Sequence, residues 1–329
     1  MTLSFSNDDN GNAPLYYVAI TLSSNAGSGF QQLINWDPST YSTYLNTDCQ
    51  NHSWQDGAGN LLDSWFETPS ATSSSTSVYE WVVLPNSTAT TIYLVFSATT
   101  ASGYSTTHTG VQPNYSTTYG QYDNGASVFS FYDNFAGTTL SSKWTVVNSG
   151  QTVNNGMSQG TTAPSIYSTS YTLNPQNTVT EAYAYVNTPL ASNANDGFIS
   201  VTIISNSHHT YNSGGYYLCD YNGTAGTDTA LDTAASNSSP SVWSVWYSAA
   251  ATGSAMVNYG TPVTLTTDIP TITAGAVQLS VHNGAATAGT QYFTWVRTRA
   301  NPPSSTMPTT TFGSATKVPS GYSQLLMAM

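Results

Sequence analysis

Charged side chains are scarce in this 329-residue sequence, since Asp, Glu, Lys and Arg make up only 6% of it, against about 25% in an ordinary domain. Four basic residues stand against 16 acidic ones, and the formal net charge is −12. Binding to nucleic acid phosphates or to anionic lipid surfaces depends on clustered Lys and Arg. The composition therefore excludes nucleic acids and anionic membrane surfaces as partners.

Cysteines and long apolar runs are also missing. Cys49 and Cys219 are too few for a disulfide framework, and no CxxC pair suggests a metal site. They are either two buried thiols or a bridge between the two domains predicted below. No window of about 18 apolar residues exists, so the sequence predicts no transmembrane helix. Residues 1–12 lack the basic segment and apolar core of a secretory signal, from which we expect a processed chain or another export route, such as virion release by lysis.

Aromatic residues are abundant in this weakly charged chain. They reach 12% of the sequence, with 23 Tyr and 8 Trp, while hydrophobic residues total 39%. Disordered chains have few aromatics and a high net charge per residue. The composition therefore predicts a folded, β-rich chain with a surface of Ser, Thr, Asn, Gln and Tyr.

The first third of the chain contains short segments with strand patterns. Residues 15–23 (LYYVAITLS) predict a strand with alternate residues on opposite faces. Asp37 followed by Pro38 predicts the start of a short helix. Further strands are predicted at residues 52–57, 60–67, 77–84 and 91–96.

Residues 127–147 predict the beginning of a second domain. They alternate apolar and polar residues, turn at Gly137 and become extended again at Trp144, which predicts two strands of one antiparallel sheet. Many short strands separated by Gly, Asn and Pro turns follow up to residue 299, which indicates an all-β sandwich. Residues 300–320 carry four prolines and predict an extended tail, and the apolar terminus at 325–329 is expected to pack on its own domain or dock on a neighbour.

The predicted fold class is therefore all-β, with two tandem antiparallel β-sandwiches of the jelly-roll type and a Pro-rich C-terminal tail. We predict domains at residues 1–118 and 119–300, followed by the tail at 301–329.

Two resemblances accompany this prediction. The segment YDNFAGTTLSSKW at residues 132–144 resembles the opening strand of concanavalin A-like, laminin G-like sandwiches, which occur in lectins and in some polysaccharide hydrolases. Residues 291–299 (QYFTWVRTR) resemble the last strand of the same domains, which implies pairing near the first strand. The segments FQQLIN (30–35), LDSWFE (62–67) and WVVLP (81–85) resemble an uncharacterised domain family of archaeal and bacterial cell-surface proteins, and this resemblance implies location but no chemistry.

Catalytic motifs are not evident. The polysaccharide hydrolases among the concanavalin A-like relatives carry Glu-x-Asp-x-x-Glu on one strand, which aims paired carboxylates at the scissile bond. This chain has three Glu residues, Glu67, Glu80 and Glu181, and none has an acidic neighbour at i+2 to i+5. The sequence therefore predicts that the chain is not an enzyme.

Three kinds of binding or modification site are candidates. An aromatic cluster could stack sugar rings, although half of it could equally be core: Tyr216, Tyr217, Tyr221, Trp243, Trp246 and Tyr247. Calcium is the one cofactor considered, with Asp8, Asp9 and Asn10 as candidate ligands and the Asp220 and Asp228–Asp232 turns as weaker ones. Five N-x-S/T sequons are candidates for glycosylation: Asn51, Asn86, Asn114, Asn222 and Asn237.

Together these features predict a non-enzymatic structural or attachment protein on an extracellular surface, in an archaeal virion spike or a cell-surface assembly. Its expected partners are copies of itself or other coat and surface proteins, and glycans are a further candidate. A carbohydrate-binding adhesin or lectin is the alternative, and a polysaccharide hydrolase ranks third.

Overall fold

A computed structural model describes most of the chain. The described residues are 3–85, 90–160, 164–172, 174, 177–186, 196–200, 207–212, 216–221, 225–232, 239–249, 252–269, 275–280 and 290–319. The chain forms two compact units, one combining Met1–Phe129 with Pro302–Met329 and the other comprising Ser130–Asn301. No helix among the described residues is long and apolar enough to cross a membrane.

Sheet A of the first unit is built around β1 (Tyr16–Leu22). It has the strand order β23-β1-β6-β3, and β24 pairs with the same edge of β1 as β23. Its other strands are β3 (His52–Gln55), β6 (Thr91–Phe96), β23 (Thr310–Phe312) and β24 (Thr316–Lys317). Val18, Ile20 and Leu22 are buried while Thr21 is exposed, so the alternation predicted for residues 15–23 is confirmed.

Sheet B of the first unit has the order β2-β5-β4-β7. Its strands are β2 (Gln31–Trp36), β4 (Ser64–Phe66), β5 (Val78–Val83) and β7 (Thr109–Val111), and β4 and β7 run parallel. After β2 comes the 3-10 helix η1 (Pro38–Tyr41), in which the Asp37 side chain accepts hydrogen bonds from the backbone N–H groups of Ser39 and Thr40. The predicted cap and short helix are therefore confirmed.

The core of the first unit holds buried tryptophans and a buried ion pair. Trp54, Trp65 and Trp81 are fully buried. His52 Nε2 lies 3.0 Å from Glu80 Oε1, and both side chains are inaccessible to solvent. Burial by itself would lower the pKa of His52, but the Glu80 carboxylate outweighs it and holds that pKa above its ordinary value.

The second unit contains two further antiparallel sheets. Sheet C has the order β10-β11-β22-β13-β18-β19-β20 with β8 also pairing with β22, and sheet D has the order β17-β16-β15-β14-β21-β12-β9. Sheet C is made of β8 (Phe131–Asp133), β10 (Gln151–Val153), β11 (Met157–Gln159), β13 (Thr178–Val186), β18 (Ser241–Ala249), β19 (Thr252–Val257), β20 (Val263–Leu265) and β22 (Gln291–Ala300). Sheet D is made of β9 (Trp144–Asn148), β12 (Ser165–Ser168), β14 (Asp196–Ser200), β15 (Ser207–Asn212), β16 (Tyr216–Tyr221), β17 (Gly226–Asp232) and β21 (Gln278–Ser280).

One apolar core joins sheets C and D. It includes Trp144, Ile166 and Leu279 from sheet D, with Ala182, Trp243 and Phe293 from sheet C. Since both sheets contribute to the same buried cluster, the second unit is a sandwich of two facing sheets. The predicted all-β fold class is confirmed, and β22 pairs with β8 as the resemblance implied.

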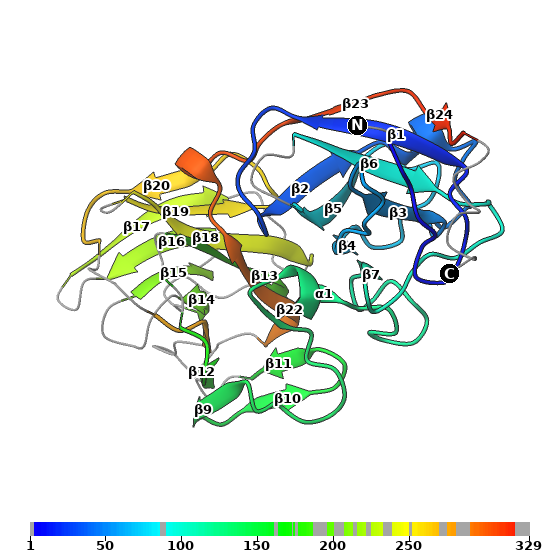
Figure 1. Cartoon of the computed structure of the whole chain (residues 1–329). Helices are drawn as coiled ribbons and strands as arrows, with labels where there is room; N and C mark the ends of the chain where they lie inside the picture. Colours follow the sequence, from blue (N-terminus) through cyan, green and yellow to red (C-terminus); the bar gives the residue numbers. More distant parts are fainter. Residues whose placement is uncertain are drawn as a thin grey trace. The chain divides into compact units, whose positions relative to one another are not determined.

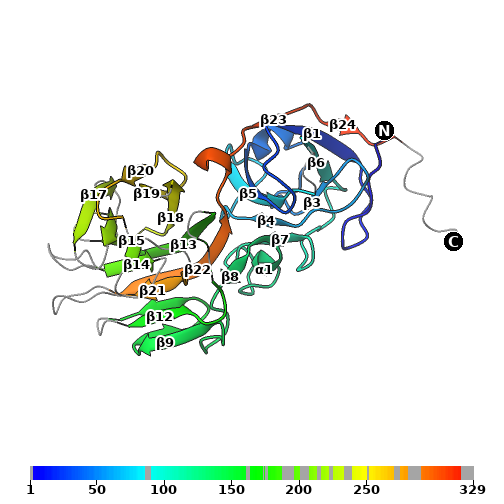
Figure 2. The ribbon, with the colours of Figure 1, turned by 60° about the vertical axis from the view of Figure 1, so that its left-hand side comes forward.

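Residues 127–147 differ from their prediction as two strands of one sheet. Gly125–Val128 forms the four-residue helix α1. β8 pairs with β22 in sheet C, whereas β9 pairs with β12 in sheet D, and Figure 2 shows β9 beside β12. The two extended segments therefore enter opposite sheets, because β8 pairs with the last strand of the unit whereas β9 pairs with β12, the third strand after it.

The unit boundaries also differ from the predicted ones. Phe129 packs edge-on against Trp65 and Trp81, with ring centroids 5.4 and 5.8 Å apart, so residues up to 129 belong to the first unit. Residues beyond 301, predicted as a separate tail, return to the first unit, where β23 and β24 run along β1 (Figure 1). The apolar terminus at 325–329 lies outside the described residues.

Candidate functional site

The candidate site lies on one face of sheet C, on the neighbouring strands β13 and β22. Alternation divides β13, because Ala182 and Ala184 enter the core while Glu181, Tyr183 and Tyr185 point the other way. On β22, Phe293 and Val296 face the core. We call the opposite side, which carries Glu181, Tyr183 and Tyr185, the outer face of sheet C.

Four aromatic side chains form a ladder across the two strands, and we refer to them as the aromatic ladder: Tyr183, Tyr185, Tyr292 and Trp295. Tyr183 stacks on Trp295 with ring centroids 5.7 Å apart and an interplanar angle of 17°. Tyr185 stacks on Tyr292 at 4.8 Å and 11°. Trp295 is buried and the three tyrosines are half-buried, so the ladder is anchored at one position and reaches solvent at the others.

A buried charge cluster continues the outer face beyond the ladder. Glu181 is paired in register with Arg297. Its Oε2 lies 2.7 Å from Arg297 Nη2, and its Oε1 lies 2.8 Å from Arg299 Nη2. The Ser244 hydroxyl donates to Oε1 at 2.9 Å. Burial would raise the pKa of Glu181, but the guanidinium groups of Arg299 and Arg297 outweigh it and hold that pKa below its ordinary value.

Arg297 connects the charge cluster to the ladder. Its guanidinium carbon lies 4.4 Å from the centroid of the Trp295 ring, a cation–π distance. Its Nη2 donates a hydrogen bond of 2.6 Å to the Tyr259 hydroxyl. Trp295, and through it Tyr183, is therefore held in place by a side chain that is itself fixed by Glu181.

This arrangement suits binding better than proton transfer. A stacked row of half-buried tyrosines offers flat apolar surface with hydroxyl groups beside it, which is what a sugar ring needs. Glu181 is fully buried and both its oxygens accept hydrogen bonds from charged donors. A carboxylate held ionised in this way cannot act as the general acid of a glycosidase, which needs a raised pKa.

The aromatic cluster predicted from the sequence is placed differently. Trp243, Trp246 and Tyr247 are buried, and Trp243 and Tyr247 belong to the core between sheets C and D, so these three side chains offer no exposed ring to a sugar. Tyr216, Tyr217 and Tyr221 lie on β16, but their side chains lie outside the described part of the chain.

The sequence prediction missed the aromatic ladder, although a signal was present. The segment TEAYAY at residues 180–185 alternates small and large residues, which places Tyr183 and Tyr185 on the same face as Glu181. Pairing with Tyr292 and Trp295 on a strand more than 100 residues away could not be read from that alternation.

The calcium candidates at the N-terminus are engaged in hydrogen bonds. Asp8 is buried, and its carboxylate accepts hydrogen bonds from the backbone N–H groups of Asn10 and Asn12. Asp9 accepts hydrogen bonds from the Ser105 hydroxyl and from His108 Nδ1, the latter at 2.7 Å. The Asn10 side-chain amide donates to the Ser102 carbonyl.

Together these bonds make the segment a turn that fastens residues 8–12 to residues 102–108. Within the described part of the chain, no three His, Cys, Asp or Glu side chains gather closely enough to hold a metal ion. The side chains of Asp220, Asp228 and Asp232 lie outside that part.

The sequons fall into three groups. Asn51 is fully buried, and its amide donates to the Tyr44 and Ser97 carbonyls at 2.9 Å, so in the folded chain it is inaccessible to glycosylation. Asn114 is exposed and keeps its place as a candidate. Asn86, Asn222 and Asn237 lie outside the described residues.

Cys49 carries a free thiol that is buried, and burial raises its pKa to about 12. This thiol is therefore protonated and unreactive at neutral pH. The side chain of Cys219 lies outside the described residues.

Comparison with known proteins gives structural neighbours only. No protein-family model matches the chain, and no curated protein matches its sequence. The structure is similar to a β-glucanase from Bacillus licheniformis (TM-score 0.42, 12% identity, covering 51% of this chain and 97% of that one). It is also similar to a β-1,3-glucanase from Mycobacterium marinum (TM-score 0.40, 15% identity, covering 52% of this chain and 98% of that one). A third similar structure is a carbohydrate-binding module from Bacillus subtilis (TM-score 0.36, 11% identity, covering 48% of this chain and 95% of that one).

These neighbours are concanavalin A-like β-sandwich proteins. They contradict the prediction of a non-enzymatic structural or attachment protein, because most of them are glycan-cleaving enzymes and one is a transglycosylase. That prediction took the absence of one carboxylate motif as evidence against a whole enzyme class. With identities of 11–15% and TM-scores of 0.36–0.42, the likeness by itself assigns neither activity nor substrate to this chain.

Proposed function

We propose that the second unit is a polysaccharide-recognising domain that binds a glycan chain along the outer face of sheet C. The observation that carries the proposal is the aromatic ladder, in which Tyr183, Tyr185 and Tyr292 are stacked in pairs and half-buried. Stacked rings on neighbouring strands provide successive platforms for successive sugar rings.

The charge cluster next to the aromatic ladder supports this proposal, because it holds the ladder rigid. Glu181 offsets only one of the two positive charges of Arg297 and Arg299, but all three side chains are buried, so the cluster exposes little charge on the face. A face that exposes little charge favours neutral polysaccharides over sulfated or uronic acid chains. Because the Glu181–Arg297 pair fixes Trp295, the stacked Tyr183 ring is already in position before the ligand arrives.

The test is affinity for neutral polysaccharides. The intact chain is mixed with a panel of neutral β-glucans, mannans and galactans, and binding is measured by affinity electrophoresis and calorimetry. We expect saturable binding to at least one polymer, and a loss of about tenfold in affinity for Tyr183→Ala and for Tyr292→Ala, equivalent to about 1.4 kcal/mol for one stacking contact.

The matched control is Tyr167→Ala, which removes a half-buried tyrosine from β12 of the opposite sheet and should leave the affinity unchanged. Absence of binding to every polymer, or equal losses in all three variants, would contradict the proposal. Reducing ends are counted in the same mixtures. Their release by the intact chain and loss in Tyr292→Ala would assign cleavage as well as binding to this face.

We also propose an extracellular location, where the protein associates with itself or with other surface proteins. The low content of charged residues and the exposed sequon at Asn114 support it, as does the resemblance of roughly residues 14–100 to cell-surface domains. Cell fractionation and intact mass of the natively produced protein test it. Recovery from the cytoplasmic fraction alone, without sugar at Asn114, would contradict it. Virion membership and an archaeal source remain predictions.

A further inference from the structure

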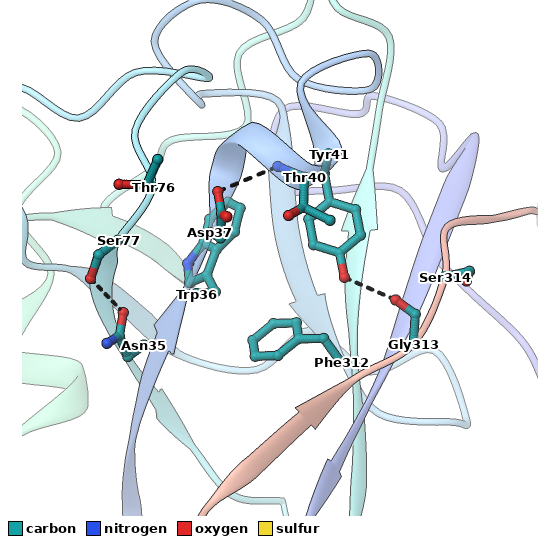
Figure 3. Close-up of a pocket in the computed structure, with 10 residues that line it drawn as sticks. All are labelled: Asn35, Trp36, Asp37, Thr40, Tyr41, Thr76, Ser77, Phe312, Gly313 and Ser314. Atoms are coloured by element: carbon teal, nitrogen blue, oxygen red, sulfur yellow. Dashed lines mark hydrogen bonds between the residues drawn. The ribbon is translucent and has the colours of Figure 1, made fainter.

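The first unit contains a pocket of about 620 Å³ between the end of β2, η1 and the end of β23. Figure 3 shows Asn35 and Ser77 on one side of it, with Tyr41 and Phe312 on the other. Its volume lies in the range of small-molecule sites. Every lining residue belongs to the first unit.

The walls of the pocket combine hydroxyl and amide groups with aromatic rings. Asn35, Thr40, Thr76, Ser77 and Ser314 contribute exposed polar side chains. The Asn35 Oδ1 atom accepts a hydrogen bond of 2.8 Å from the Ser77 hydroxyl. Within the described part of the chain the Asn35 Nδ2 group has no hydrogen-bond acceptor, so it is available to a ligand as a donor.

Aromatic surface is provided by Phe312. It is half-buried, and its ring centroid lies 6.5 Å from that of Tyr41 at an angle of 38°. Tyr41 is itself fixed, because its hydroxyl donates a hydrogen bond of 2.9 Å to the Gly313 carbonyl. The pocket therefore has one partly accessible ring on a rigid backing.

The charge of the pocket restricts the ligand class. Among the described residues no Lys, Arg or His lines it, and Asp37 contributes the one carboxyl group of that lining. Hydrogen bonds from the Ser39 side chain and from the backbone keep the pKa of Asp37 below its ordinary value, so this carboxylate is ionised at neutral pH. This negative charge disfavours anions, and the many polar groups of the lining disfavour lipids. Neutral polyhydroxylated ligands fit best, because their hydroxyl groups both donate and accept hydrogen bonds, as the hydroxyl and amide groups of the pocket do.

We propose that this pocket is a second carbohydrate site, specific for a single neutral sugar unit or chain end, and independent of the outer face of sheet C. The Asn35 amide and the neighbouring hydroxyl groups bind the sugar hydroxyls, and the Phe312 ring packs against the apolar face of the sugar. The site goes beyond the proposed function of the second unit, since it lies in the first.

The C-terminal segment completes this site. Phe312, Gly313 and Ser314 are brought to the pocket by pairing of β23 with β1, with Ile20 opposite Phe312. Gln32 Nε2 donates a buried hydrogen bond of 2.9 Å to the Pro308 carbonyl, which fixes the approach to β23. The pocket thus forms only when residues 308–314 are docked on the first unit.

Saturation-transfer NMR and calorimetry on the full chain test the proposal. The probes are methyl glycosides of glucose, galactose, mannose and N-acetylglucosamine, with choline and calcium chloride as alternative cations for Asp37. We expect one or more neutral glycosides to bind in the millimolar range, and at least fivefold weaker binding for Asn35→Ala and for Phe312→Ala. Asn35 is exposed, so its replacement should not affect folding, whereas Phe312→Ala is checked by thermal melting.

Asn114→Ala, at another exposed asparagine of the first unit, is the matched control and should bind as the unmodified chain does. Tyr292→Ala should retain this binding even if it loses polysaccharide binding, which separates the two sites. The proposal is overturned if no neutral glycoside binds, if only choline or calcium binds, or if Asn35→Ala and Asn114→Ala behave alike.

Discussion

At the residue scale, the buried ion pairs of the two units respond to pH in opposite directions. The pKa of His52 is raised by Glu80, so this pair contributes its full stability below the ordinary histidine value of 6.5 and loses it as pH rises through the raised pKa. The pKa of Glu181 is lowered by two arginines. Its contribution is present above the ordinary value of 4.5 and is lost as pH falls through the lowered pKa.

Replacement of Glu181 tests the second of these pairs. Glu181→Gln keeps the side-chain shape but leaves Arg297 and Arg299 buried without a counter-charge. We expect the free energy of unfolding of the second unit to fall by roughly 3–5 kcal/mol at pH 7. The difference in free energy of unfolding between Glu181→Gln and the unmodified chain should shrink at about pH 3, because the Glu181 carboxylate of the unmodified chain stabilises the fold less as it becomes protonated. Urea unfolding followed by circular dichroism at both pH values measures it.

Asp48→Asn removes one negative charge from an exposed position in the first unit and serves as the control. We expect a change within about 0.5 kcal/mol for this surface variant. A loss below 1 kcal/mol for Glu181→Gln, or an equal loss at the two pH values, would show that the cluster contributes no charge-dependent stability.

At the element scale, the C-terminal strands protect a sheet edge. β1 pairs with β6 along one side and with β23 and β24 along the other. Without these two strands, the backbone N–H and C=O groups of that second side would have no partner strand. An unpaired edge is unfavourable and promotes association between chains.

Truncation after Asn301 tests this role. The change removes the pairing of β23 and β24 with β1. It also removes the hydrogen bonds that the Gly313 and Pro308 carbonyls accept from Tyr41 and Gln32. We expect the melting temperature of the first unit to fall by roughly 5 °C or more, since each lost kcal/mol lowers it by about 2–4 °C in a unit of this size. Light scattering should show self-association. A chain ending after Pro319 keeps both strands and should melt as the full chain does; equal melting of the two truncated chains would refute the role.

At the scale of the whole molecule, the second unit is an insertion between two segments of the first. Its first and last strands pair, with Phe131 opposite Thr298, and Ser130 N donates to the Thr298 carbonyl at 3.1 Å. Its two ends therefore lie side by side, as expected for an inserted domain. The second unit also has its own apolar core.

An excised fragment tests the independence of the second unit. We expect residues 130–301 to fold alone, with a strand-type circular dichroism spectrum, a cooperative thermal transition and the polysaccharide affinity of the full chain. The comparison fragment 119–300 carries Phe129 but lacks Trp65 and Trp81, on which the Phe129 ring packs. The ring is therefore exposed in this fragment and should lower its solubility. A non-cooperative transition of the 130–301 fragment would mean that its core is insufficient.

The sequence by itself determined the features that depend on near neighbours. Alternation located β1, strand patterns located β5 and β6, and Asp37 with Pro38 located η1, because strand patterns and helix capping act over a few residues. The aromatic content and low charge indicated a folded, β-rich chain, and the many short strands between Gly, Asn and Pro turns indicated the all-β class. Residues 132–144 and 291–299 indicated a β-sandwich in which the first and last strands pair.

Only the tertiary structure decided which face and which partner each element has. β8 and β9 enter opposite sheets. The Trp243 side chain lies in the core, whereas Tyr183 reaches solvent. The sequon residue Asn51 is buried, and its amide donates hydrogen bonds to the Tyr44 and Ser97 carbonyls. The chain end that looked like a free tail forms an edge strand and one wall of a pocket. These outcomes depend on contacts between residues that are far apart in the chain, and a local pattern carries no information about which distant strand will cover it.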